Sequence, residues 1–82
     1  MKIVKEEIGD MLAMLKESNI TCDIQLLKGG IYWSVQQDNE DAEGNSVDLL
    51  SAMTDLSESV LRLHPKSKFS SWYGEKKRLL QQ

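Results

Sequence analysis

The stretch TCDIQLLKGGIYWSVQQ, residues 21–37, constrains the fold of this chain more than any other segment. On each side of the two glycines, apolar and polar residues alternate with a period of two, and β-branched or aromatic residues are frequent. This alternation is typical of half-buried β-strands, in which successive side chains point to opposite faces. Adjacent glycines suit the positive φ angles of a type I′ turn. The segment therefore predicts a β-hairpin.

The register of this hairpin depends on the length of its turn. A two-residue turn at Gly29-Gly30 would pair Leu26 with Trp33 and bring the apolar faces of the two strands together. A three-residue loop would set Leu26 against Tyr32 and mix the faces, which a half-buried sheet resists. We therefore expect the two-residue turn, with one apolar face made by Cys22, Ile24, Leu26, Ile31, Trp33 and Val35.

Helical periodicity flanks the hairpin on both sides. Apolar residues at spacings of three and four predict one helix before it, with Val4, Ile8, Met11, Leu12 and Leu15, and one after it, with Leu49, Met53, Leu56, Val60 and Leu63. Asn45 or Ser46 is expected to cap the second helix. Pro65 should end it, because the residue before a proline is pushed out of helical geometry. Residues 67–82 predict a short third helix, interrupted at Gly74.

These elements predict an α+β fold in the order αββαα. A two-stranded antiparallel sheet is packed on one face by two helices, and a short helix follows at the C-terminus. We expect one small domain, residues 1–82, because a chain of this length supports only one thin core. With Cys22 as the single cysteine, an internal disulfide is excluded. The sequence shows neither a signal peptide nor a run of ~20 apolar residues, so a cytoplasmic protein without a membrane partner is expected.

Recognisable catalytic and metal-binding patterns are missing from the sequence. His64 is the only histidine, and there is no nucleophile motif, glycine-rich phosphate loop or C-x-x-C pattern. Residues 39–50 match an EF-hand calcium loop at several positions but place Leu50 where the bidentate glutamate is required. We therefore expect a non-enzymatic protein with no catalytic residue, no cofactor and no metal site.

Charge is distributed unevenly along the chain. Residues 1–60 contain twelve acids and four lysines, whereas residues 61–82 contain six bases and one acid. Residues 36–48 contain five acids and no base. Such asymmetry indicates charged partners, although attraction between the two parts within one domain would explain the same pattern.

The acidic segment and the outer face of the hairpin make the candidate site for a protein partner. Carboxylates on an ordered scaffold can compete for a surface that binds phosphates, so the partner would suit a nucleic-acid-binding complex. Tyr32, with Leu27 as its expected cross-strand neighbour, would supply an apolar anchor. The expected contact residues are Tyr32, Asp38, Glu40, Asp41 and Glu43. The alternative for the acids is a solvated connection near a helix N-terminus, where negative charge is favourable. The open sheet edges would also allow a homodimer.

The alternative function is direct nucleic-acid binding through residues 66–78. This segment interleaves bases with aromatic residues, as in grooves that hold single strands: Lys66, Lys68, Trp72, Lys76, Lys77 and Arg78. In the competing interpretation, Phe69, Tyr73 and Leu80 dock the last helix on the core while the bases face water. The surplus of acids elsewhere would also repel a polyanion.

In size, acidity and element order, the chain resembles the small phage-encoded inhibitor proteins of the anti-CRISPR kind. The resemblance covers the whole chain in these general features, and the stretches DNEDAEG and GGIYWSV carry no signature motif. It implies a viral inhibitor that acts in the cytoplasm of the host cell and occupies the nucleic-acid site of an effector complex. The basic C-terminal segment departs from a simple DNA-mimic pattern.

Overall fold

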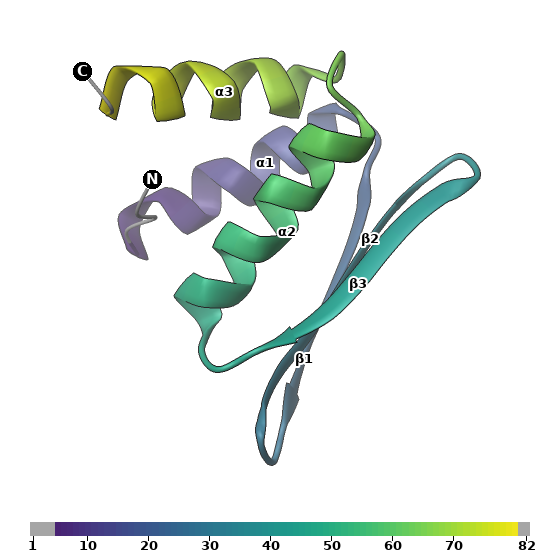
Figure 1. Ribbon diagram of the computed structural model, residues 1–82, viewed down its shortest axis with the longest axis vertical. Helices are drawn as coiled ribbons and strands as arrows, with labels where there is room; N and C mark the ends of the chain where they lie inside the picture. The colour runs from purple at the N-terminus through teal and green to yellow at the C-terminus, as the bar shows by residue number, and fades with distance from the viewer. Residues whose placement is uncertain (1–4, 81–82) are drawn as a thin grey trace.

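The computed structural model describes the backbone of residues 5–80 and the side chains of residues 5–79. Its elements in chain order are η1 (Lys5–Glu7), α1 (Ile8–Glu17), β1 (Thr21–Leu27), β2 (Gly30–Gln37), β3 (Glu40–Ser46), α2 (Leu49–Leu63) and α3 (Lys68–Leu80). The strands form one antiparallel sheet in the order β1-β2-β3, and all three α-helices lie on the same side of it (Figure 1). The predicted α+β class is confirmed. The predicted two-stranded sheet and the order αββαα are wrong, because a third strand follows the hairpin.

The third strand replaces most of the predicted acidic connection. Residues 40–46 are poor strand formers, being Glu, Asp, Ala, Gly, Asn and Ser. They nevertheless pair with β2 along their whole length, from Gln37 opposite Glu40 to Ile31 opposite Ser46. β3 also packs against α2. Tertiary contacts therefore form this strand in spite of its low intrinsic propensity.

Small residues on the inner face of β3 make room for a tryptophan. Ala42, Gly44 and Ser46 alternate along this face, and Gly44 lies directly opposite Trp33. A Cβ atom on Gly44 would lie 2.7 Å from Cζ2 of Trp33, so only glycine fits without movement. The indole Nε1 of Trp33 donates to Ser46 Oγ (3.2 Å), which donates to Asp55 Oδ2 on α2 (2.6 Å). Trp33 is thereby fixed between the sheet and α2.

The β1–β2 hairpin is confirmed, but its register differs from the predicted one by two residues. Residues 28–29 form the turn, so Leu27 pairs with Gly30 and Ile24 pairs with Trp33. A shift of two residues leaves every side chain on its predicted face, because side chains alternate with a period of two. The apolar pattern therefore predicts the face of each residue without fixing the register.

The predicted type I′ turn is also wrong. Neither of the turn residues 28 and 29 has a positive φ angle, whereas Gly30 has a φ of 150°. A Cβ atom on Gly30 would lie 2.6 Å from the backbone oxygen of Ser46. Glycine is needed at this position for its backbone conformation and for the close approach of β3.

The second helix ends before Pro65, as predicted. Its cap is Asp48 rather than Asn45 or Ser46: the carboxylate of Asp48 accepts a hydrogen bond of 2.8 Å from the backbone N–H of Ser51. This bond lowers the pKa of Asp48.

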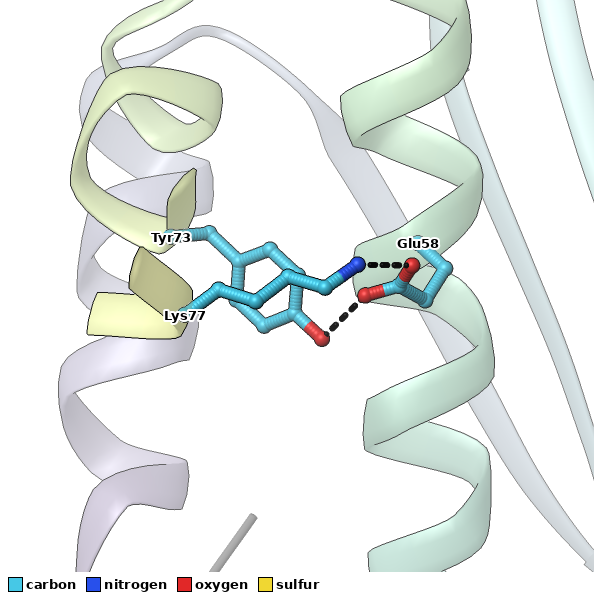
Figure 2. A network of polar contacts seen from close by, with 3 residues as sticks. All are labelled: Glu58, Tyr73 and Lys77. Carbon is cyan, nitrogen blue, oxygen red and sulfur yellow. Dashed lines mark hydrogen bonds and ion pairs between the residues drawn. The ribbon is translucent and has the colours of Figure 1, made fainter. Parts of the chain in front are cut away.

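The third helix, predicted within residues 67–82, is confirmed, but the predicted interruption is wrong, because the helix continues through Gly74. Phe69 and Tyr73 are fully buried, with stacked rings 5.8 Å apart, which confirms that they dock α3 on the core. The Tyr73 hydroxyl donates to Glu58 Oε2 on α2 (2.6 Å), and Lys77 Nζ donates to Glu58 Oε1 (2.7 Å), as Figure 2 shows. Burial and the bond to Glu58 raise the pKa of Tyr73.

The hydrophobic core lies between the sheet and the helices. Its buried members are Met11, Leu15, Ile20, Ile31, Trp33, Val35, Ala52, Met53, Leu56, Val60, Phe69 and Tyr73. Three residues expected on apolar faces are instead exposed: Leu12 (43%), Leu26 (84%) and Leu49 (40%). Val4 and the side chain of Leu80, which also belong to the predicted core, lie outside the described residues.

Between residues 5 and 80, none of the helices has the length and apolar character needed to cross a membrane.

Candidate protein-binding surface

The sheet face that points away from the helices is uncovered by the described part of the chain (Figure 1). On β2, buried Ile31, Trp33 and Val35 face the helices, so the alternate residues of all three strands face outward. We call this set the open face: Thr21, Asp23, Gln25, Leu27, Tyr32, Ser34, Gln36, Asp41, Glu43 and Asn45. It contains three acids and no base.

Carboxylates lie on both sides of the open face. Ser34 on the central strand pairs with Asp23 of β1 on one side and with Glu43 of β3 on the other. Asp41 is two residues from Glu43 on β3, on the same face of the sheet, and lies opposite Gln36. Asp23, Asp41 and Glu43 are exposed, and none of them forms an ion pair with a described residue. The three negative charges are therefore held on one regular scaffold and are not neutralised by a described base.

Tyr32 lies between Gln25 and Asn45, on the central strand of the open face. Its hydroxyl donates a hydrogen bond of 2.6 Å to Oε2 of Glu43. This bond raises the pKa of Tyr32, because the neighbouring carboxylate disfavours the phenolate. The predicted neighbour of Tyr32, Leu27, pairs with Gly30 instead, so that prediction is wrong.

The structure brings only some of the predicted contact residues together. Tyr32, Asp41 and Glu43 share the open face. Asp38 lies in the turn between β2 and β3 with a φ of 55°, a conformation that aspartate tolerates better than most residues. Glu40 is exposed at the start of β3 on the opposite, helix-facing side of the sheet.

Asp23 is a member of the acidic set that the sequence reasoning left out. Its position between Cys22 and Ile24 in the alternating pattern already predicts that it faces outward. The acidic segment, residues 36–48, follows the hairpin in the sequence, so Asp23 is not among the predicted contact residues. Only the pairing of β3 with β2 shows that acids from both edge strands lie on the same face.

The basic C-terminal segment pairs with helical acids and not with the acidic strand. Lys76 pairs with Glu7, Lys77 with Glu58 at 2.7 Å and Arg78 with Glu75 at 2.5 Å. Attraction between the two parts of the chain therefore accounts for acids in η1 and α2. It does not account for the acids of β3, which make no ion pair with any described base.

The structure brings only four of the six residues of the alternative nucleic-acid site together, beside one groove along α3, whereas Lys77 points toward Glu58 of α2 and Arg78 does not border the groove. Trp72 is half-buried and borders a groove of about 600 Å³ together with Lys66, Lys68 and Lys76. Lys76 Nζ lies 5.4 Å from the centre of the Trp72 ring, so this cation already occupies part of the aromatic surface. Lys66 and Lys68 are exposed and form no ion pair with a described residue.

Among the described residues, no three His, Cys, Asp or Glu side chains lie close enough together to hold a metal ion.

Comparison with known proteins identifies no relative of this chain. A scan against models of protein families found no match, and searches of curated proteins and of solved structures found none either.

Proposed function

We propose that this chain is a non-enzymatic binding protein that engages a basic surface of a protein partner through the open face, as an inhibitor or regulator. The observation that carries the proposal is the arrangement of Asp23, Asp41 and Glu43. They are exposed on one uncovered sheet face with no base on that face and no ion pair to a described residue. A surface with one sign of charge attracts a complementary surface and steers its approach.

The rigidity of the sheet supports the same proposal. The opposite side of β2 is anchored by buried Ile31, Trp33 and Val35. Residues two apart on one strand, such as Asp41 and Glu43, are spaced by about 7 Å, and strands two apart lie roughly 10 Å from each other. The charges are therefore presented at fixed distances, and little side-chain or backbone ordering is needed on binding.

Tyr32 adds an apolar contact to the acidic surface. Its ring is only half-buried and its hydroxyl is already bonded to Glu43. An aromatic ring with a satisfied polar end can be covered by a partner without leaving an unpaired hydroxyl. The partner class that fits best is a nucleic-acid-binding protein, because such proteins have basic surfaces built to hold phosphates.

The test compares two variants with the same change in net charge. The first, Asp23→Asn/Asp41→Asn/Glu43→Gln, neutralises the open face. The matched control, Glu6→Gln/Asp10→Asn/Glu17→Gln, neutralises three exposed acids of η1 and α1. Each immobilised protein captures partners from a lysate of the native host, and quantitative mass spectrometry measures recovery. We expect basic partners to be lost with the first variant only; equal recovery with both would reject the proposal.

A second candidate function is nucleic-acid binding along α3. The observation in its favour is the pair of exposed lysines, Lys66 and Lys68, beside the groove at Trp72. Its test is a gel-shift assay with single-stranded DNA and RNA at low salt. Binding that weakens steeply with salt and is lost in Lys66→Ala/Lys68→Ala would support this function. Absence of a shift at low salt would exclude it.

A further inference from the structure

We propose that two copies of this chain pair along the free edge of β1 to form a continuous six-stranded antiparallel sheet. The inference is independent of the acidic site, because it concerns the backbone edge of the sheet and not the open face. β1 pairs with β2 over all seven of its residues, Thr21–Leu27, and with no other strand. No backbone hydrogen bond links it to any other described segment. Its second edge is therefore a row of unpaired donors and acceptors.

β1 lacks most of the features that protect edge strands from pairing, and Asp23 is its only charged residue. Natural edges are blocked by proline, by charged side chains and above all lysine, by bulges or by a covering element. β1 contains neither proline nor lysine, and its register with β2 runs without a bulge. Leu26, near the end of the strand, is 84% exposed although it points to the apolar side of the sheet. A second sheet beside β1 would cover this side chain.

The other edge of the sheet is unsuited to self-pairing. β3 carries three carboxylates, on Glu40, Asp41 and Glu43, and no base. A two-fold axis at its centre would place Glu43 directly opposite Glu43 of the second copy, and like charges in facing positions are destabilising. Pairing of β1 with β3 of the next copy is a heterologous contact, which leaves free edges at both ends of the assembly unless it closes into a ring. Symmetric pairing through β1 is the closed arrangement that avoids the opposed glutamates.

The sequence of β1 favours one register. With the two-fold axis at Ile24, all seven residues of β1 pair with β1 of the second copy. Ile24 then faces Ile24 of the second copy, Cys22 faces Leu26, and Asp23 faces Gln25. Apolar side chains then meet on the helix side of the sheet, while on the open face Asp23 meets Gln25 and Thr21 meets Leu27. An axis at Asp23 would oppose two like charges. An axis at Gln25 would pair only five residues and set Asp23 against Leu27.

An axis perpendicular to the sheet keeps the helices of both copies on one side. The open faces of the two copies then become one surface, in which the acids Asp23, Asp41 and Glu43 occur twice. The dimer would thus present its charge over twice the area. This consequence follows from the symmetry and does not depend on whether the acidic surface binds a partner.

The first part of the test is the mass of the protein in solution. We expect sedimentation equilibrium of the unmodified chain to show a concentration-dependent change from the monomer mass of 9.3 kDa to about twice that value. Leu26→Lys should keep the protein monomeric, since a lysine on an edge strand opposes pairing. This residue is exposed in the monomer, so the variant should fold, which the fluorescence of buried Trp33 reports. A monomer at every concentration up to about 1 mM would overturn the proposal.

The second part of the test determines the register by oxidative crosslinking. In a Cys22→Ser background, Ile24→Cys would place two thiols opposite each other, at a Cα separation near 5.5 Å that permits a disulfide. The matched control, Thr21→Cys, would leave its two thiols six residues apart along the strand, about 20 Å. We expect a crosslinked dimer from the first variant only. A dimer that Leu26→Lys does not dissociate, or that crosslinks through position 21 and not 24, would overturn the proposed edge and register.

Discussion

Gly44 faces Trp33 across the β2–β3 pair so closely that a methyl group at position 44 would lie 2.7 Å from the indole ring. The contact explains how a strand of poor strand formers is held in the sheet, because the indole fills the space that a side chain would occupy. Trp33 also donates to Ser46, which is bonded to Asp55 of α2. The acidic strand is therefore attached to the core through its small residues.

Replacing Gly44 by alanine is expected to destabilise the protein by about 1–3 kcal/mol, the usual cost of overpacking. Urea unfolding followed by tryptophan fluorescence measures the change. The control is Gly9→Ala, where a Cβ would meet nothing within 4 Å in α1. That change should stabilise by ~0.5–1 kcal/mol, because alanine restricts the unfolded chain. Equal stability of the Gly44→Ala variant and the native chain would contradict the tight contact.

Ser57 is a second site where packing predicts whether a substitution raises or lowers the free energy of unfolding. Its side chain is fully buried on α2, and its Oγ atom has no hydrogen-bond partner in the described part of the protein. A buried hydroxyl without a partner costs roughly 1–3 kcal/mol. Ser57→Ala removes this cost and has a better helix propensity, so we expect a gain of about 1 kcal/mol in the free energy of unfolding. A loss of stability in thermal or urea unfolding would show that the hydroxyl is satisfied.

Acid should weaken the contact between α2 and α3 through Glu58. Burial raises the pKa of this carboxyl, but hydrogen bonds from Lys77 and Tyr73 outweigh it, so its pKa lies below the ordinary 4.5. A carboxyl with a lowered pKa in the folded state stabilises above its unfolded pKa, and the stabilisation is lost as the pH falls through the folded value. Between pH 5 and 3, unfolding free energies should fall less steeply for Glu58→Gln than for the native chain. Parallel curves would contradict this role.

Alkali should act on the same cluster through Tyr73. Burial, together with the bond to Glu58, raises the pKa of this phenol above its ordinary 10. A group with a raised pKa in the folded state stabilises below its unfolded pKa, and the stabilisation is lost as the pH rises beyond it. The native chain should therefore lose stability above about pH 10. Tyr73→Phe should lose less stability in that range. At pH 7 we expect this change to cost about 1 kcal/mol, because Glu58 is partly exposed.

The sequence was sufficient for the faces of the hairpin and insufficient for its register. Alternation places Ile24, Trp33 and Val35 on one face whichever two-residue turn is chosen, since registers two residues apart keep the same faces. The choice between them depends on Gly30, which is fixed by the backbone of Ser46 in a strand that the sequence did not predict. The turn of the β1–β2 hairpin therefore depends on a contact with β3 of the next hairpin.

The missed strand shows the same dependence on tertiary contacts. Nothing in the intrinsic propensities of residues 40–46 indicates a strand. The available signal was the alternation of small Ala42, Gly44 and Ser46 with polar residues. This alternation indicates a strand only once Trp33 is known to lie opposite Gly44. Without β3, the sequence could identify Tyr32 and Glu43 as candidates, but not their hydrogen bond or the addition of Asp23 to the same face.

The third helix lacks the predicted interruption at Gly74 for a related reason. An interior glycine costs about 1 kcal/mol relative to alanine, which favours an interruption at Gly74. Burial of Phe69 and Tyr73 on the core contributes several times that amount, so the helix continues to Leu80. Packing of one apolar face offsets the local cost.

The central claim is that the three carboxylates of the open face determine partner binding. Its most direct measurement is the recovery of a captured partner by the native chain, by Asp23→Asn/Asp41→Asn/Glu43→Gln and by the control Glu6→Gln/Asp10→Asn/Glu17→Gln. We predict that the open-face variant recovers at least about tenfold less, equivalent to roughly 1.4 kcal/mol, while the control matches the native chain. Recovery that falls equally in both variants, or in neither, would contradict the claim.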